Sequence, residues 1–534
     1  MENRQCDLCY QMGIRWISRD KHSFHMILSR SWRVVAAGMV IAVAARAEVV
    51  LAPLFADGMV LQRNQPIHIW GTADAAEKVK IEFAGQSAEA TTGQNGRWLV
   101  TLPAQPASTQ SREIQIQGNN SVVIHDVLVG DVWICSGQSN MEFVVRDSRD
   151  GAREMATADQ PLIRHIKIGR KLSEKPLEAF KATPWWRADP AHVGDFTAVG
   201  YFFARDMLQE TGVPIGLINC SWSGTSVEPW MSAKALAAKP EFAVIGERWQ
   251  ADLAAYPGRR RIYDETIVEW EKSEMAARSA GEKAHQEFLK NHRRPRPPAG
   301  APDHPYPGNP SQIYNGMVYP LRHAAIRGVL WYQGEANAVR AREYAALFKE
   351  SIAGWRETFD RPELPFYYVQ IANFTVDTDW PRLREAQTTA LALPNTGMAV
   401  TIDIGDPDNI HPTNKQEVGR RLAVIALAKL EHRSIEYSGP IYSRVEFSGG
   451  AAKVSFTHAA GLQARNGPVS ALEVAGMDRV FHVADGRIES GHLIVNSPAV
   501  LAPVAVRYAW AAAPRANLYN AAGLPASPFR SDDW

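Results

Sequence analysis

A serine just beyond an apolar run has the residue type and the setting for nucleophilic chemistry. The run begins at Val132 and stops at Gly137, two residues before Ser139. A near-continuous apolar run is typical of a buried parallel strand, and ligand sites of open α/β sheets lie beyond the carboxyl ends of such strands. Alternatively, Gly137 and Asn140 only shape a strand-to-loop turn. The nucleophile hypothesis therefore requires a base and an oxyanion site at other strand ends.

A histidine that follows an acidic residue by three positions could supply the base. Asp408 and His411 lie in a loop after an apolar run, just before a helical pattern that starts near Asn414. A serine hydroxyl is weakly nucleophilic until a base takes its proton, and a carboxylate on the second ring nitrogen best orients a neutral imidazole. Asp403 and Asp406 lie in the same loop and stay open as alternatives to Asp408.

Two further strand ends carry groups that could stabilise an oxyanion. Small residues fill the segment 219–225 after one apolar run, where a backbone amide could approach a ligand closely. Another run ends at Gln333, which would place a side-chain amide at its tip. The alternative is that Gln333 and Glu335 only cap backbone groups.

Strand and helix patterns alternate through the middle of the chain, which predicts an α/β fold with a parallel sheet covered by helices on both faces. After the run that leads to Ser139, the predicted strands are Leu162–Ile168, Ile215–Asn219, Gly328–Tyr332, Phe366–Ile371 and Met398–Ile404. The predicted helices are Val199–Glu210, Arg340–Phe359, Leu383–Leu393 and Asn414–Leu430. A charged, then proline-rich insertion at about 231–310 interrupts this rhythm and is either a lid or a solvated excursion.

Short β-rich segments broken by turn residues flank the α/β region on both sides. They predict an N-terminal β-domain over 48–126 and a C-terminal β-domain over 433–534, both of β-sandwich type, around a catalytic domain over 127–432. For the N-terminal β-domain, structural support is favoured over sugar binding, because no aromatic cluster stands out there.

The first 47 residues have the pattern of a secretory signal. Arg30 and Arg33 precede the apolar run 34–45, and Ala45 and Ala47 fit a small-residue cleavage site, although translation could also start at Met26. The run is too short for a good membrane span, so the mature protein is expected to be exported without one, and an uncleaved anchor is the alternative.

Composition and cysteine usage limit the partners. The chain has 534 residues, 46% of them hydrophobic and 22% charged, which suits a globular protein with more than one core. A formal net charge of +1 does not provide the excess positive charge that nucleic-acid binding requires.

The pair Cys6 and Cys9 would leave with the signal, whereas Cys135 and Cys220 would remain as buried thiols or as a disulfide.

Three sequence blocks together resemble a known family. Gly137–Met141, Gln333–Glu335 and Asp408–Pro412 are similar to the motifs of the sialate O-acetylesterase family of SGNH hydrolases and occur in the expected order. The resemblance runs from about Glu48 to the C-terminus. It implies an SGNH-hydrolase-like (flavodoxin-like) parallel sheet between two β-sandwich-type domains, and it differs from α/β-hydrolases because the first block lacks the second glycine of G-x-S-x-G.

The resemblance also implies roles for individual residues. Ser139 would be the nucleophile, His411 the base and then the acid, and Asp408 the group that orients His411. The oxyanion donors would be the amides of Ser139 and Gly224 and the side chain of Gln333. Candidate sugar-binding residues, for which packing or capping is an equal alternative, are Glu335, Asn337, Glu228, Trp230 and Trp331. One departure is Ala336, which stands where many relatives have serine.

The expected function is an exported carbohydrate O-acetylesterase that forms an acyl-enzyme. Its substrate would be an O-acetylated sialic acid or, alternatively, an acetylated plant polysaccharide such as xylan or xyloglucan. An alternative of another class is a noncatalytic glycan-binding protein. The predicted chemistry requires no metal and no cofactor, and Asp408 with His411 is too small a set for a metal site. The sugar, the acetylated position and the oligomeric state are not specified by these motifs.

Overall fold

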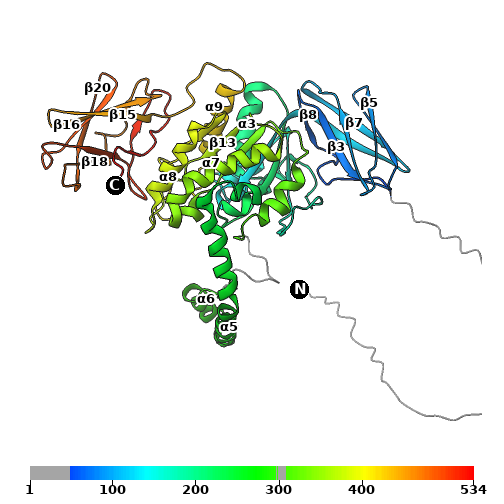
Figure 1. Ribbon diagram of the computed structural model, residues 1–534, viewed down its shortest axis with the longest axis horizontal. Coiled ribbons are helices and arrows are strands. Elements are labelled where there is room, and N and C mark those ends of the chain that lie inside the picture. The colour runs from blue at the N-terminus through cyan, green and yellow to red at the C-terminus, as the bar shows by residue number, and fades with distance from the viewer. Residues whose placement is uncertain (1–47, 296, 299–307) are drawn as a thin grey trace, which may run out of the picture. The chain divides into compact units, whose positions relative to one another are not determined.

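The computed structural model describes residues 48–295, 297–298 and 308–534. The predicted signal over 1–47 and part of the insertion lie outside the described residues. Along the chain, a β-rich region, an α/β region and a second β-rich region follow one another (Figure 1). Among the described helices, none is long and apolar enough to cross a membrane.

A mostly parallel sheet forms the centre of the α/β region. Its order is β10-β9-β11-β8-β12-β13-β14, and only the edge strand β10 runs antiparallel. The six parallel strands β9-β11-β8-β12-β13-β14 are, numbered by their order in the chain, 2-3-1-4-5-6, so the first strand of this set, β8, lies inside the sheet. The strands are β8 (Ser121–Gly137), β9 (Gln160–Lys167), β10 (Trp186–Ala188), β11 (Ile215–Ser221), β12 (Gly328–Tyr332), β13 (Phe366–Val369) and β14 (Thr396–Ala399).

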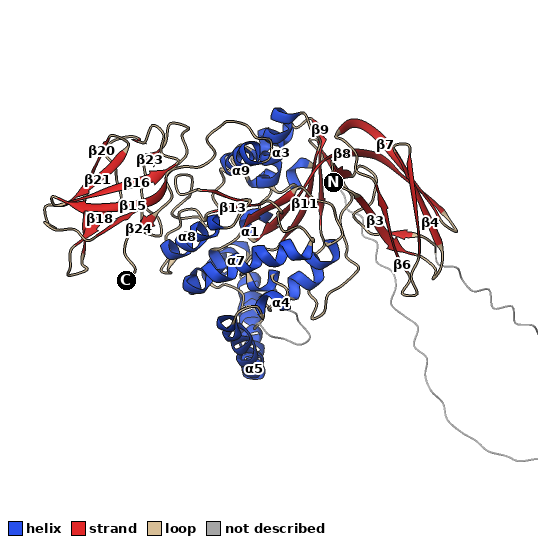
Figure 2. Cartoon of the chain, turned by 45° about the horizontal axis from the view of Figure 1, so that its top comes forward, coloured by secondary structure: helices blue, strands red, loops and turns tan. Residues whose placement is uncertain are grey.

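Helices cover both faces of this sheet, which confirms the predicted layers (Figure 2). One face packs against α3 (Ala198–Thr211) and α9 (Lys415–Lys429), where Trp133 of β8 shares a buried cluster with residues of both helices. The other face packs against α7 (Ala341–Thr358) and α8 (Trp380–Thr388), where Trp331 of β12 is buried in a second cluster. The apolar stripes predicted for these helices are therefore the faces that they bury.

The predicted strand Met398–Ile404 is wrong at its C-terminal end. The observed strand β14 ends at Ala399, because its neighbour β13 ends at Val369, the residue paired with Ala399. Beyond this pair β14 has no ladder partner, and Thr401 instead donates its hydroxyl to the carbonyl of Gln370 at 2.6 Å. A long loop therefore separates β14 from α9, and this loop carries His411.

The N-terminal β-rich region is joined to the central sheet by β8 itself. The first part of β8 pairs antiparallel with β7 (Ser108–Gln117), whereas its last part pairs in parallel with β11 and β12. One strand thus runs through the predicted domain boundary at residues 126–127. The other strands of this region are β1 (Val50–Leu51), β2 (Val60–Gln62), β3 (Ile67–Thr72), β4 (Lys78–Phe83), β5 (Gln86–Thr91) and β6 (Arg97–Leu102).

The C-terminal region consists of antiparallel sheets, in agreement with the predicted β-rich pattern. One sheet has the order β15-β16-β21-β20 and another has the order β19-β18-β22-β24, with β17 and β23 as a separate pair. The strands are β15 (Ile441–Ser448), β16 (Ala451–Thr457), β17 (Gln463–Ala464), β18 (Leu472–Ala475), β19 (Phe481–Val483), β20 (Asp485–Glu489), β21 (His492–Asn496), β22 (Ala505–Tyr508), β23 (Leu518–Tyr519) and β24 (Phe529–Arg530).

The described part of the insertion is helical. It contains α4 (Ala233–Leu236), the long helix α5 (Ala243–Ser279) and α6 (Glu282–Asn291). α5 and α6 contact each other through Trp270 and Phe288, whose ring centroids lie 5.5 Å apart. Most side chains of both helices are exposed, which agrees better with a solvated excursion than with a buried element.

The two described cysteines are free and buried. Cys135 lies on β8 and Cys220 on β11, and neither forms a disulfide. Burial raises the pKa of both thiols well above the ordinary value, so both stay protonated and unreactive. The open choice between thiols and a disulfide is therefore decided in favour of thiols.

Candidate active site

Ser139 lies where the sequence predicts it, directly beyond the end of β8. The strand stops at Gly137, and Ser139 is the first residue of the short helix α1 (Ser139–Glu142). Gly137 has a φ of +130°, and a Cβ atom there would lie 2.1 Å from the carbonyl oxygen of Tyr332 on the neighbouring strand β12. Only glycine fits this close approach. The turn leaves Ser139 partly exposed while its neighbours Gln138 and Asn140 are buried.

Backbone amides near Ser139 are open to a ligand. The chain leaving β11 is tied to this turn, because the N–H of Trp222 donates to the carbonyl of Gly137 at 3.0 Å. Gly224 follows two residues later, exposed and with a φ of +74°. Within the described part of the chain, neither the N–H of Ser139 nor that of Gly224 has a hydrogen-bond partner. Unpaired donors beside a nucleophile are what an oxyanion requires.

Glu142, three residues after the candidate nucleophile, holds the Gly224 loop in place. Its carboxylate accepts hydrogen bonds from the backbone N–H and the hydroxyl of Ser223, at 2.9 and 2.7 Å. It also accepts from Arg170 at 2.6 Å. Burial alone would raise the pKa of Glu142, but the hydrogen bonds from Ser223 and Arg170 hold it below the ordinary value. An ionised Glu142 therefore fixes the donor loop to the helix that carries Ser139.

His411 lies half-buried in the loop between β14 and α9. Its ring centroid is 6.4 Å from that of Phe143, which follows α1, and its backbone N–H donates to the side chain of Asn409 at 2.9 Å. Burial and the positive charge of Lys415 both lower the pKa of His411. The imidazole is therefore neutral at physiological pH, which is the state that a general base needs.

The three acidic residues of this loop have different surroundings. Asp403 is engaged by Arg421, whose guanidinium donates to both carboxylate oxygens at 2.6 and 2.7 Å. Asp406 accepts the backbone N–H of Asp408 at 2.9 Å. The carboxylate of Asp408 is exposed and, within the described residues, has no hydrogen bond or ion pair, including none with His411. Asp403 is thus committed elsewhere, and the assignment of Asp408 stays a prediction.

Gln333 is fully buried and its amide is already occupied. Its Nε2 donates to the carbonyl of Thr225 at 3.2 Å and to the side chain of Asn337 at 2.8 Å, and its Oε1 accepts from the hydroxyl of Tyr344 at 2.9 Å. This conformation leaves Gln333 no N–H for an oxyanion, contrary to the expectation of direct donation. Its contacts instead fix Thr225, next to Gly224, so they support a positioning role.

All five candidate sugar-binding residues lie inside the protein. The side chain of Asn337 donates to Glu228 at 3.0 Å, and Glu228 also pairs with Arg340 at 3.0 Å. Trp230 donates its indole N–H to the hydroxyl of Thr225 at 2.9 Å. The five residues Glu335, Asn337, Glu228, Trp230 and Trp331 are all buried. None of them has the exposed surface that a sugar contact requires, so the packing and capping alternative fits the structure.

Sequence reasoning missed one buried charge at the site. Lys415, the first residue of α9, is fully buried, and its ammonium donates to the side chain of Asn140 at 2.5 Å. The signal was present in the sequence, because Lys415 shares the apolar stripe of α9 with Val418, Gly419 and Leu422, at i, i+3, i+4 and i+7. Such a position normally holds an apolar side chain.

Fold and site together define a class of protein. A serine at the carboxyl edge of a mostly parallel sheet, with open backbone amides and a neutral histidine in the loop between β14 and α9, is the set of groups that a serine hydrolase uses.

Comparisons with known proteins show which serine hydrolases this chain resembles. Residues 129–256 and 302–428 match the family model described as carbohydrate esterase, sialic acid-specific acetylesterase. A crystal structure of a carbohydrate acetylesterase from Xanthomonas citri is 36% identical with a TM-score of 0.77, and the match covers 91% of this chain and 100% of that one. Sialate O-acetylesterases of Rattus norvegicus and Homo sapiens are 28% and 26% identical, over 88% of this chain and 92% and 90% of theirs.

The chain therefore belongs to the sialic acid-specific acetylesterase family of carbohydrate esterases. This finding confirms the resemblance that its three motif blocks carry.

Proposed function

We propose that this protein is an exported, SGNH-type carbohydrate O-acetylesterase that cleaves acetyl esters on sugars through an acyl-enzyme at Ser139. The observation that carries the proposal is that the N–H groups of Ser139 and Gly224 have no partner within the described residues, in a loop and a turn that Trp222 and Glu142 tie together. A noncatalytic glycan-binding protein would not require open donors next to a hydroxyl, whereas an oxyanion does.

The proposed reaction has two acyl-transfer steps. The Ser139 hydroxyl attacks the acetyl carbonyl while His411 takes its proton, and the oxyanion accepts from the amides of Ser139 and Gly224. When this intermediate collapses, His411 returns the proton to the sugar oxygen, and the acetyl group stays on Ser139. Water, deprotonated by His411, then attacks the acetyl carbonyl, and His411 returns that proton to the Ser139 oxygen as acetate leaves. Asp408 would orient His411 after a small movement of its exposed loop.

Sialic acid O-acetyl groups are the proposed substrates. The description of the matched family and the names of the mammalian relatives support this choice. Acetylated plant polysaccharide such as xylan or xyloglucan is the second candidate, because the 36% identical Xanthomonas citri protein is described by the wider term carbohydrate acetylesterase.

A panel of natural esters tests both the reaction and the substrate. Acetate release is measured from 9-O-acetylated sialic acid and from acetylated xylan, xyloglucan and pectin, with Ser139→Ala as the matched control. Faster release from the sialic acid supports the first substrate, and equal rates on all four indicate a permissive acetyl site. Absence of hydrolysis by the wild type on every ester would overturn the enzyme proposal and favour glycan binding.

Export is part of the proposal and has its own test. Cleavage after Ala47 would give a mature chain that begins at Glu48, the first described residue. Cell fractionation followed by N-terminal sequencing measures this directly. A chain that keeps residues 1–47 in the cytoplasm contradicts it.

A further inference from the structure

Asn140, the residue after the candidate nucleophile, joins three elements of the site. Its Nδ2 donates to Glu335 at 2.6 Å, in the loop after β12, and to the carbonyl of Ile410 at 3.0 Å, in the loop that carries His411. Its Oδ1 accepts from the ammonium of Lys415 at 2.5 Å. Asn140 is buried, so these contacts are shielded from competing water. One side chain thus connects the nucleophile turn to the histidine loop.

Lys415 lies at a position where its charge lowers the stability of the fold. Its side chain is fully buried, with the ammonium 4.8 Å from the ring centroid of Phe143 and 5.2 Å from that of Tyr332. These rings stabilise the cation, but burial of an ammonium still costs free energy that an apolar side chain on the same stripe of α9 would avoid. The carboxylate that faces it is Glu335, whose second oxygen has no partner within the described residues.

We propose that Lys415 is a positioning residue for the reaction of Ser139 and His411: by holding the amide of Asn140, it fixes the His411 loop against the nucleophile turn. The inference rests on the proposed function, because it assigns His411 the role of the base. Lys415 fixes the orientation of Asn140, since an ammonium can donate only to the amide oxygen and therefore turns the amide nitrogen toward Ile410 and Glu335.

The charge of Lys415 has a second consequence at His411. Burial lowers the pKa of Lys415 to about 7, and the negative charge of Glu335 opposes this shift. Burial likewise raises the pKa of Glu335 and of Tyr332, the other titratable groups against Lys415. In the acidic range where an imidazole titrates, Lys415 is therefore charged. Its charge adds to the effect of burial in lowering the pKa of His411, which keeps the base neutral.

The test compares Lys415→Met with the wild-type full chain over a pH series of kcat and KM on a chromogenic acetyl ester. We expect kcat to fall about 10- to 100-fold while KM for the small ester changes little, because loosened loops misplace the base without removing it. We also expect the acid limb of kcat/KM to move to higher pH, since loss of the neighbouring charge raises the pKa of His411. Lys415→Arg keeps a charge and is expected to keep the wild-type acid limb.

Lys429→Met is the matched control, because Lys429 lies at the other end of α9, with its ammonium 4.9 Å from the ring centroid of Tyr437. It should reproduce the wild-type profile. A folded Lys415→Met enzyme with wild-type kcat and an unmoved acid limb would overturn the inference. If that variant does not fold, Asn140→Ser tests the same link, and an unchanged kcat there overturns it too.

Failure of the proposed function can be told apart from failure of this inference. If the wild type hydrolyses no ester, NMR titration of His411 in the wild type and in Lys415→Met still compares the two imidazole pKa values. Equal values contradict the inference, and a higher value in the variant supports the electrostatic part of it independently of activity.

Discussion

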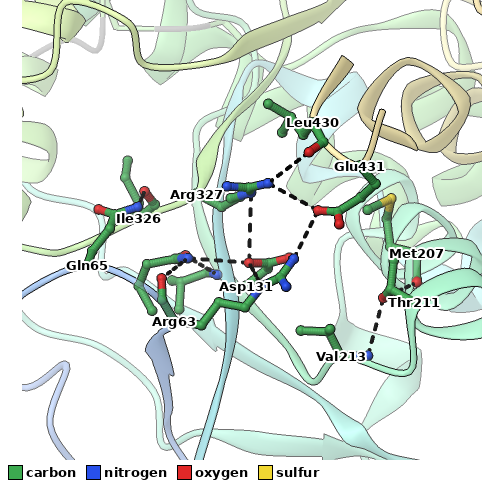
Figure 3. A network of polar contacts seen from close by, with 12 residues as sticks. Arg63, Gln65, Asp131, Met207, Thr211, Val213, Ile326, Arg327, Leu430 and Glu431 are labelled. Atoms are coloured by element: carbon green, nitrogen blue, oxygen red, sulfur yellow. Dashed lines mark hydrogen bonds and ion pairs between the residues drawn. The ribbon is translucent and has the colours of Figure 1, made fainter. Parts of the chain in front are cut away.

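The two edges of the central sheet use polar groups in opposite ways. At the amino edge, Asp131 of β8 accepts from Arg63 at 2.8 and 2.9 Å, and Arg63 and Arg327 both contact Glu431, at 2.9 and 3.1 Å (Figure 3). At the carboxyl edge, the amide of Ser139 has no partner within the described residues. The charged side chains at the amino edge form ion pairs with one another, whereas a backbone N–H at the carboxyl edge has no protein acceptor within the described residues.

The polar groups at the amino edge of the sheet therefore act on stability, and those at the carboxyl edge act on function. A buried charge whose partner is removed destabilises a protein strongly, so loss of one member of the amino-edge network should destabilise the junction between β8, α9 and the N-terminal β-rich region. The amides of Ser139, which is partly exposed, and of Gly224, which is exposed, have no partner within the described residues and stay available to a ligand. Helix α9 links the two edges, since Lys415 lies at its start and Glu431 just beyond its end. Changes at the two edges should therefore have opposite signatures.

The largest expected effect is the loss of activity in Ser139→Ala. Removal of the nucleophile should lower kcat by about 10⁴-fold or more. The melting temperature should stay close to that of the wild type, because Ser139 is partly exposed and its hydroxyl has no hydrogen-bond partner within the described residues. Acetate release and thermal unfolding measure the two quantities. Retained activity would place the nucleophile elsewhere.

Two acidic residues of one loop, Asp408 and Asp403, are expected to differ in the same way: one acts on activity and the other on stability. Asp408→Asn should lower kcat by about 10²- to 10⁴-fold with little change in stability, if Asp408 orients His411. Asp403→Asn should instead lower the free energy of unfolding by about 1 to 3 kcal/mol, because it leaves the buried Arg421 with Glu417 as its remaining ion-pair partner. Steady-state kinetics and denaturant unfolding of both variants give the answer. The reverse pattern would make Asp403 the partner of His411.

At the amino edge, Asp131→Ala should act on stability alone. We expect the free energy of unfolding to fall by about 3 kcal/mol, since Arg63 loses both hydrogen bonds to Asp131, while kcat of the folded enzyme stays within about twofold. Glu113→Ala is the control, because its pair with His125 is exposed and should contribute less than about 1 kcal/mol. A large loss of kcat in folded Asp131→Ala would show that the edges are coupled.

The smallest expected effect is a pH-dependent one at Asp126, on the N-terminal side of β8. Burial alone would raise its pKa, but hydrogen bonds and charge from Arg164 and Arg187 lower it from 3.8 to about 2. Because the folded value is the lower one, its stabilisation is present above about pH 4 and is lost as the pH falls toward 2.

Asp126→Asn should therefore lower the free energy of unfolding at neutral pH by about 1 kcal/mol, allowing for solvent screening. The difference from the wild type should disappear near pH 2. Urea unfolding at several pH values measures this, and a difference that does not depend on pH would contradict the linkage.

The sequence by itself determined the order of the elements and singled out the two candidate reacting groups, Ser139 and His411. Runs such as 328–332 and the stripe of α9 reveal strands and helices because side-chain periodicity is a local property of the backbone. Ser139 could be singled out for the same reason, because it follows the end of a strand directly, whereas His411 was singled out by its spacing from Asp408. The three motif blocks together also indicated the family to which the chain belongs.

Only the tertiary structure decided what each polar side chain contacts. Lys415 reaches Asn140 across 275 residues of sequence, and Gln333 reaches Thr225 across 108. Local patterns cannot show such pairs, because folding brings distant segments together and burial then makes every unpaired polar group costly. Strand ends therefore revealed where the chemistry lies, whereas the fold decided which side chains remain open to a substrate and which are occupied in holding the site together.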